Sequence, residues 1–497
     1  MTSSAPRALP DGLAAGLVFL ASGAVLVLEI VGLRLVAPYV GVTLETSSAI
    51  IGFALAAIAL GAWAGGRLAD SADVRRLLGF LLVLGGALMM LVLPVIRYVG
   101  AVLPGSAAGA VLVLAALAVV GPAAVLSAVP PMVVTLQLAT LARTGTVVGR
   151  MSSIGTLGAI AATFLTGFVL VALFASSTIL LGTGAVLLVA GVALSIYLRQ
   201  PGRAAVPVAV LLVGVLGVGL TVFAPQPCDL ETRYHCARVD ADPLRPSGQL
   251  LILDALRHSY VDAADPTYLE FDYIQAIASV ADVQAPAGTP IGAVHIGGGG
   301  LTLPRYLAAT RPGGSNLVLE VDPGVAALAL SLEPGTGPGL DVRVTDGRVG
   351  LAEQPADSAD LVVGDAFGGL AVPWHLTTRE AVTDVARVLR PDGIYALNVI
   401  DYPPNHFARA EIATVLDVFA HVAVIATAGA LDGTSGGNFV LVASTRPLPL
   451  EPLATRLAER GSALRIASGG AVEEFAGDAA VLTDELAPVD QLLTPYG

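Results

Sequence analysis

The first 224 residues contain seven apolar runs, each near the roughly 20 residues that a helix needs to cross a bilayer. Only 13% of the whole chain is charged, about half the charge typical of a soluble domain, which favours membrane spans over one very large core. The first run is too long for a cleavable signal peptide, and another follows closely. The predicted spans are about 13–38, 47–69, 77–98, 106–128, 151–174, 176–198 and 205–224.

The charge balance divides the chain into a membrane domain, 1–224, and a second domain, 225–497. The first carries +5 and the second −18. The acidic second domain argues against a nucleic-acid partner, because duplex binding needs a basic face. All 26 basic side chains are Arg, which excludes a pyridoxal Schiff base and a P-loop lysine.

Short-loop arginines predict the orientation of the spans in the lipid bilayer. With the N-terminus inside, the outer loops hold only Arg97, and seven crossings place residues 225–497 outside the cell membrane. Pro122, Pro130 and Pro131 interrupt the stretch 122–146, where an additional crossing would reverse this result. The arginines on the inner side are Arg7, Arg67, Arg75, Arg76, Arg143, Arg150, Arg199 and Arg203.

Two cysteines, Cys228 and Cys236, follow the last span. Outside the cytoplasm such a close pair most simply forms a disulfide, which supports the outside placement. Two unrelated buried thiols are the alternative. A zinc site is not expected, because His235 alone between the cysteines does not complete four ligands, and no other metal site is predicted.

Ionisable and small residues within the spans suit helix packing. Glu29 and Arg34 lie in the first span, either in a polar pathway or in contacts with neighbouring helices near the membrane boundary. Gly61, Gly65 and Gly66 suit close packing between helices. No transport motif is recognisable.

From residue 250 short apolar runs alternate with helix-length segments, which predicts an α/β domain with a mostly parallel sheet covered on both faces. Ligands of such sheets bind at the carboxyl ends of the strands, where the strand order reverses. The predicted strands are 250–254, 293–296, 317–322, 342–346, 360–365 and 394–400.

Two features at predicted strand ends indicate a nucleoside-containing cofactor. Gly297, Gly298, Gly299 and Gly300 connect a strand to a helix, where the backbone can approach a ligand closely, although a plain tight turn is the alternative. Glu320 ends the next strand, where a carboxylate can accept both hydroxyls of a ribose.

Two further acids end later strands. Asp346 could accept a hydrogen bond from an adenine amino group or be an ordinary turn residue. Asp365 precedes the Gly-rich loop AFGGLAVP and is the best candidate for the reacting centre. A carboxylate there can orient an amine and help to remove its proton, whereas the alternative is an Asp that caps the loop.

Residues 231–400 resemble the spermidine synthases (polyamine aminopropyltransferases), in particular their membrane-fused bacterial relatives. The similar motifs are LLILDALRHSYVDAADPTYLEFDY, the glycine turn, LEVD, DG and the Asp-led loop with VPWHLTT. In the membrane domain, SGAVLVLEIVGLRLVAPYVG and GGRLAD also look like the fused proteins. The resemblance implies a Rossmann-like, class I methyltransferase-type fold, with a small β segment at 231–262 and a core at about 270–445.

The resemblance also implies roles for individual residues. Glu320 would hold the ribose, Asp346 and Gly347 the adenine, and Asp365 would accept the proton. His235 falls at a cofactor-contacting Gln of the family, Pro373 near its loop Pro, and Tyr273 at a substrate-side Tyr.

The amine side departs from the family pattern. Gly300 replaces the substrate-binding Asp of G-G-G-D-G, and Gly368 replaces the second Asp of D-x-x-D. Ile274 stands where the family usually has His or Gln. A lone carboxylate poorly replaces several carboxylates around two ammonium groups, so putrescine is a doubtful acceptor.

Three functions fit this sequence. The first is aminopropyl transfer from decarboxylated S-adenosylmethionine to an amine or other nucleophile, and the second is methyl transfer from S-adenosylmethionine on the same fold. The third is a non-catalytic nucleoside-binding sensor or interaction module on a transporter-like membrane domain, which an outside location favours because these sulfonium compounds are made inside cells. The oligomeric state is open, a homo-oligomer included.

Overall fold

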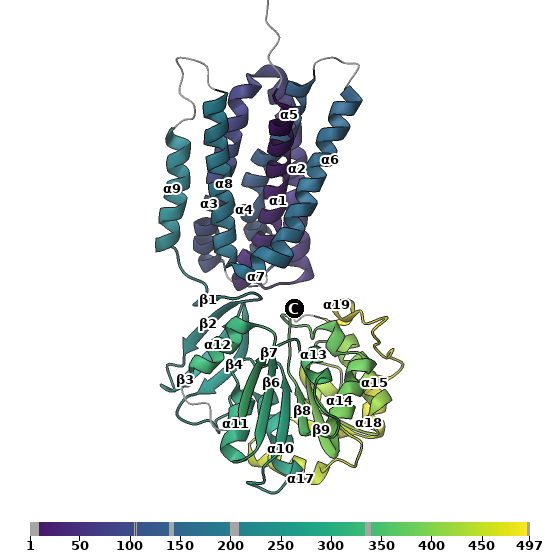
Figure 1. Ribbon diagram of the computed structural model, residues 1–497. Helices are drawn as coiled ribbons and strands as arrows, with labels where there is room; N and C mark the ends of the chain where they lie inside the picture. The colour runs from purple at the N-terminus through teal and green to yellow at the C-terminus, as the bar shows by residue number, and fades with distance from the viewer. Residues whose placement is uncertain are drawn as a thin grey trace, which may run out of the picture. The chain divides into compact units, whose positions relative to one another are not determined.

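The computed structural model describes residues 9–103, 105, 107–138, 144–198, 208–332 and 339–494. The chain divides into two compact units, Met1–Cys236 and Ala237–Gly497, the first helical and the second built around strands (Figure 1). The sequence predicted a domain boundary after residue 224, twelve residues before the observed division. The segment between the two belongs to the helical unit, because Glu231 contacts Arg97 and Thr232 contacts Arg34.

Six helical stretches among the described residues are long and apolar enough to cross a membrane, and they match the first six predicted spans. The seventh prediction, 205–224, coincides with α9, a shorter apolar helix whose first three predicted residues are not among those described. The helices are α1 (Asp11–Val40), α2 (Leu44–Ser71), α3 (Val74–Val102), α4 (Ala108–Ser127), α5 (Val129–Gln137), α6 (Thr144–Phe164), η2 (Leu165–Leu170), α7 (Val171–Leu173), α8 (Ser176–Tyr197) and α9 (Val208–Phe223).

The arginines that predict the orientation are only partly described. Arg7, Arg143, Arg199 and Arg203 lie outside the described residues. α4 and α5, which meet at Ala128 within the proline-containing region, form one candidate span, Ala108–Gln137. The total number of membrane crossings therefore depends on whether α9 also crosses the membrane.

Small and charged residues of the first unit have separate packing roles. A Cβ on Gly61 or Gly65 would collide with the backbone of Ala124 or Ala128, whereas one on Gly66 would meet nothing within 4 Å. The close packing predicted for the three glycines therefore holds for two of them. Arg34 donates to Ser176 Oγ at 2.9 Å, which is a contact to a neighbouring helix.

A short segment after α9 closes the first unit. It contains β1 (Leu230–Glu231) and a disulfide between Cys228 and Cys236, whose Cα atoms are 5.3 Å apart. The Glu231 carboxylate lies 3.6 Å from Arg97 Nη2 and accepts from the Ser177 N–H at 3.0 Å. The disulfide-closed segment is thus attached to α3 and α8.

The second unit begins with an antiparallel meander of β2 (Cys236–Ala241), β3 (Gly248–Leu253) and β4 (Leu256–Asp262). An eight-stranded sheet follows in the order β12-β10-β11-β9-β8-β5-β6-β7. Its strands are β5 (Gly292–Ile296), β6 (Ser315–Glu320), β7 (Leu340–Val344), β8 (Ala359–Gly364), β9 (Leu389–Asp401), β10 (His421–Ala426), β11 (Gly437–Ser444) and β12 (Arg465–Ser468).

Five neighbouring strands, β9-β8-β5-β6-β7, run parallel, which confirms the predicted mostly parallel sheet. β11, β10 and β12 extend the β9 edge with antiparallel pairs. The chain moves outward from β5 to β7 and then returns to β8 on the other side of β5. The strand order therefore reverses between β5 and β8, where ligands of such sheets bind.

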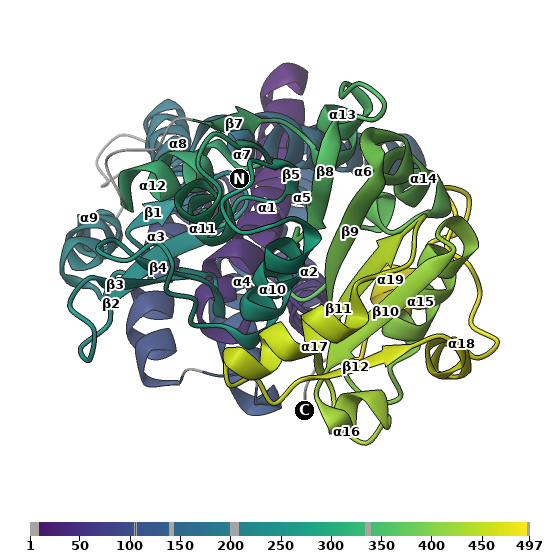
Figure 2. The same ribbon diagram turned by 90° about the horizontal axis from the view of Figure 1, so that it is seen from below.

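Helices cover both faces of this sheet (Figure 2). Along β8, Val362 belongs to the buried cluster with α14 and α15, while Leu361 and Val363 belong to the cluster with α10 and α17. This alternation explains the continuous apolar strand sequences. The helices are α10 (Asp272–Gln284), α11 (Thr302–Thr310), α12 (Pro323–Leu332), α13 (Gly347–Ala352), η3 (Trp374–Leu376), α14 (Arg379–Val388), α15 (His406–Val418), α16 (Ala428–Leu431), α17 (Leu450–Glu459), α18 (Gly470–Ala476) and α19 (Val489–Leu492).

Candidate active site

The glycine turn after β5 lies against the loop after β8. Gly297 has φ +94°, and a Cβ there would collide with the backbone carbonyl of Asp365. The Asp365 N–H donates to the Ile296 carbonyl oxygen at 2.9 Å. A glycine is therefore required at 297 both for its backbone angle and for this close approach.

The Glu320 carboxylate is held rigidly at the end of β6. Oε2 accepts from the Gly298 N–H at 2.8 Å, and Oε1 accepts from the Asp322 N–H at 2.9 Å. The side chain is 8% exposed. Each carboxylate oxygen can accept a second hydrogen bond, so the pair could receive two hydroxyl groups.

Asp365 lies directly after β8 between two polar side chains. Tyr273 Oη donates to Oδ2 at 3.3 Å, and Asn398 Nδ2 donates to Oδ1 at 2.9 Å. Burial raises the pKa of Asp365 to about 6, because the two hydrogen bonds only partly offset the loss of hydration. The group can therefore exchange a proton near neutral pH.

Asp346 directly precedes α13 and already has several hydrogen-bond partners. Oδ1 accepts from the N–H groups of Arg348 and Val349 at 3.0 and 3.1 Å, and Oδ2 lies 2.9 Å from His375 Nε2. This carboxylate acts as a helix N-cap. A Cβ on Gly347 would lie 2.5 Å from Ile296 Cγ2, so the backbone of this turn packs directly on β5.

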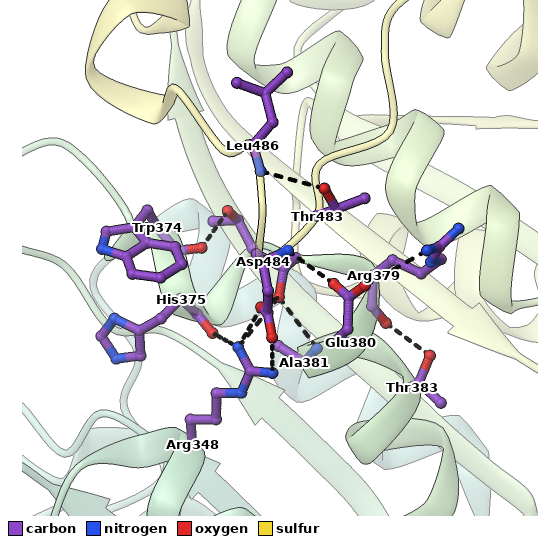
Figure 3. A network of polar contacts seen from close by, with 12 residues as sticks. Arg348, Trp374, His375, Arg379, Glu380, Ala381, Thr383, Thr483, Asp484 and Leu486 are labelled. Atoms are coloured by element: carbon purple, nitrogen blue, oxygen red, sulfur yellow. Dashed lines mark hydrogen bonds and ion pairs between the residues drawn. The ribbon is translucent and has the colours of Figure 1, made fainter.

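A polar network around Arg348 and Asp484 holds the turn that carries His375 (Figure 3). Pro373 precedes η3, and its carbonyl oxygen accepts from the Leu376 N–H at 2.8 Å. Arg348 donates to the His375 carbonyl oxygen at 3.1 Å and to both oxygens of Asp484 at 2.6 and 2.7 Å. The C-terminal segment thereby fixes the turn that carries His375.

A small apolar pocket lies beside this turn. It is bounded by the ends of β5 and β8, by the loop after β8 and by α13 and α14. The pocket adjoins Gly347, because Ile296 and Leu376 line the pocket and are also the side chains nearest to a Cβ on Gly347. The lining residues are Ile296, Arg348, Leu351, Gly364, Ala366, Val372, Leu376, Ala381, Val385, Tyr395 and Leu397.

The two positions where acids are missing differ in the room around them. A Cβ on Gly300 would lie 2.9 Å from both Ser259 Cβ and Val261 Cγ2. The nearest atom to a Cβ on Gly368 would be the Ala371 carbonyl oxygen at 4.0 Å. An acid at 300 would therefore disturb β4, whereas the loop at 368 has space for one.

The structure brings Gly297, Gly298, Glu320, Asp365 and Tyr273 together at the reversal point. His235 belongs to the first unit, where its N–H donates to Thr232 Oγ1 at 2.8 Å, so its contact with a cofactor stays a prediction.

The sequence interpretation missed Asn398, although one polar residue within the buried strand run IYALNVI is a usable signal. In the described part of the chain, no group of three or more His, Cys, Asp or Glu side chains is arranged to hold a metal ion.

No family model matches the sequence. A curated polyamine aminopropyltransferase of Vibrio vulnificus (strain CMCP6) is 31% identical over 130 residues, which are 25% of this chain and 42% of that protein. A solved probable spermidine synthase from Corynebacterium glutamicum ATCC 13032 is 28% identical, with a TM-score of 0.49 over 54% of this chain and 98% of the other. Human methyltransferase-like protein 13 in complex with SAH is 18% identical, with a TM-score of 0.30 over 43% of this chain and 96% of the other.

Spermidine synthase-like relatives thus cover part of the chain, which in turn spans less than half of the curated relative's length. The predicted fusion of such a domain to a membrane domain of the same family stays a prediction.

Proposed function

We propose that the second unit is a transferase that passes an aminopropyl group from decarboxylated S-adenosylmethionine to an amine or other nucleophile. The observation that carries this proposal is the Glu320 carboxylate, which two backbone N–H groups fix at the end of β6, beside the glycine turn that follows β5. The 31% identity with a polyamine aminopropyltransferase supports the same chemistry.

The chain's residues would divide the work between binding and proton transfer. Glu320 would accept the ribose hydroxyls, and the Gly297–Gly300 turn would let the donor approach the backbone. Asp346, which already caps the turn at Gly347, would accept a hydrogen bond from the adenine amino group. When bound, the sulfonium donor supplies a carbon with a neutral thioether as its leaving group.

Asp365 would accept the proton in the transfer step. The acceptor nitrogen forms a new bond to the donor carbon, and the C–S bond breaks with its electron pair left on sulfur. The proton released by the nitrogen goes to the Asp365 carboxylate. A pKa of about 6 leaves this group mostly ionised at neutral pH yet basic enough to take a proton.

Titration of the full-length protein with both sulfonium compounds tests the donor. We expect decarboxylated S-adenosylmethionine to bind more tightly than S-adenosylmethionine. Tighter binding of the carboxylated compound would indicate methyl transfer, the second candidate. Binding of neither, with the protein folded, would contradict both transferases and favour the non-catalytic module.

We expect diamines to be poor acceptor substrates, because Gly368 supplies no second carboxylate to bind an ammonium group. We expect Gly368→Asp to raise kcat/KM for putrescine by about tenfold, the scale of one charge-assisted hydrogen bond. The open space at this position makes the change structurally tolerable. Gly368→Asn is the matched control, since it adds the same volume without charge. An equal gain in the control would mean that charge at 368 does not act on the acceptor.

We propose that the second unit lies outside the cell membrane, with α9 as the seventh crossing. The short-loop arginines and the Cys228–Cys236 disulfide support this side. A reporter fused after residue 497 should therefore read the outer side, and the donor would then have to be available there. A cytoplasmic readout would contradict the orientation and put the site where sulfonium donors are made.

A further inference from the structure

Two asparagine side chains form a chain of hydrogen bonds that ends on Asp365. Asn438 Nδ2 donates to Asn398 Oδ1 at 2.9 Å, and Asn398 Nδ2 donates to Asp365 Oδ1 at 2.9 Å. The three residues come from β11, from β9 and from the position directly after β8, which are neighbours in the sheet. Val440 is the register partner of Asn398, so Asn438, two residues earlier, shares its face of the sheet.

Asn398 is an unusual residue for its position. It is 1% exposed within the central strand β9, among Ala396, Leu397 and Val399. A buried amide costs free energy unless it is hydrogen-bonded. Both ends of this amide are used, one by Asn438 and the other by the carboxylate of the candidate reacting centre.

The direction of the Asn398 amide matters for the carboxylate. Its NH₂ end stabilises an ionised Asp365, whereas a 180° flip would turn its oxygen toward the carboxylate. Asn438 opposes the flip, because a flipped Asn398 would turn its NH₂ group toward the NH₂ group of Asn438. On the other side of Asp365, Tyr273 from α10 is the titratable group that faces Oδ2. The backbone N–H of Asp365 donates to the carbonyl oxygen of Ile296 in β5.

We propose that Asn438 and Asn398 are positioning residues that hold Asp365 in the orientation and the ionised form required to accept a proton. Asn398 acts directly on Oδ1, and Asn438 acts through Asn398 by fixing the direction of its amide. This inference rests on the role proposed above for Asp365.

The test compares Asn438→Asp with the native full-length protein in detergent. A carboxylate at 438 accepts hydrogen bonds and should draw the Asn398 NH₂ toward itself, which leaves the Asn398 oxygen against Asp365. Carbodiimides react with protonated carboxyl groups, so peptide mass spectrometry can follow labelling of Asp365 against pH. We expect the labelling midpoint to rise by about one pH unit or more, a tenfold change in the proton equilibrium, and the acid limb of kcat/KM to move with it.

A double-variant cycle separates the amide relay from simple charge repulsion. Asn398→Leu should itself raise the midpoint, because it removes the donor, and Asn438→Asp should add little in that background. Equal shifts in both backgrounds would contradict the relay. Asn438→Ala, which removes the donor without adding charge, should give a smaller upward shift and serves if Asn438→Asp does not fold. An unchanged midpoint in folded Asn438 variants would also overturn the proposal.

The labelling midpoint does not depend on turnover. A shifted midpoint in a protein that transfers no group would support the relay and contradict the transferase. Turnover with an unshifted midpoint would do the reverse.

Discussion

Replacement of Asp365 by Asn should lower kcat for group transfer by about 10²- to 10⁴-fold, the usual contribution of a positioned general base. Asn has nearly the same shape but cannot accept the proton. Donor affinity should change little, because Glu320, at the end of a different strand, is proposed to hold the ribose. The measurement is single-turnover transfer together with donor binding by calorimetry.

The matched control for this change is Asp392→Asn. Asp392 is an exposed acid near the opposite end of β9 from Asn398 and pairs with Arg446. The Asp392→Asn variant should leave kcat unchanged.

In the native protein kcat/KM should rise with pH through about 6, where Asp365 loses its proton, and level off above that pH. An Asp365→Asn variant with more than a tenth of native kcat would contradict the proton-acceptor role.

Replacement of Glu320 by Gln should weaken binding of 5′-methylthioadenosine by about 10²-fold or more. The change removes the charge and puts an NH₂ group against either the Gly298 or the Asp322 N–H. Hydrogen bonds to a charged group contribute about 1.5–3 kcal/mol each, and two of them would face the ribose hydroxyls. The measurement is the dissociation constant by calorimetry.

Glu353→Gln is the control for that experiment, since Glu353 is an exposed residue at the C-cap of α13. It should bind the nucleoside as the native protein does. Native affinity in Glu320→Gln, with the fold intact, would mean that this carboxylate does not hold the ligand.

Much of the fold could be predicted from the sequence, because apolar runs of strand length mark β5 to β9 directly. The antiparallel strands β10, β11 and β12 were not predicted. β12 has only four residues, and it pairs with β10, from which β11 and α17 separate it along the chain. The glycine turn, Glu320 and Asp365 were accessible because each directly follows or ends a strand, and parallel strands bring such ends to one edge.

The parts of the site that sequence reasoning missed depend on register and long-range contacts. Asn398 meets Asp365 because Leu397 is the register partner of Gly364, and no local pattern specifies that pairing. Arg348 and Asp484 are 136 residues apart in sequence. The prediction of seven spans is confirmed for six of them, because α9 is shorter than the six candidate spans among the described residues.

The most direct test of the central claim is an experimental structure of the full-length protein with 5′-methylthioadenosine. We predict both ribose hydroxyls within hydrogen-bonding distance of the Glu320 carboxylate and the sulfur on the side of Asp365. A nucleoside bound elsewhere, or a Glu320 side chain turned away from the ribose, would contradict it.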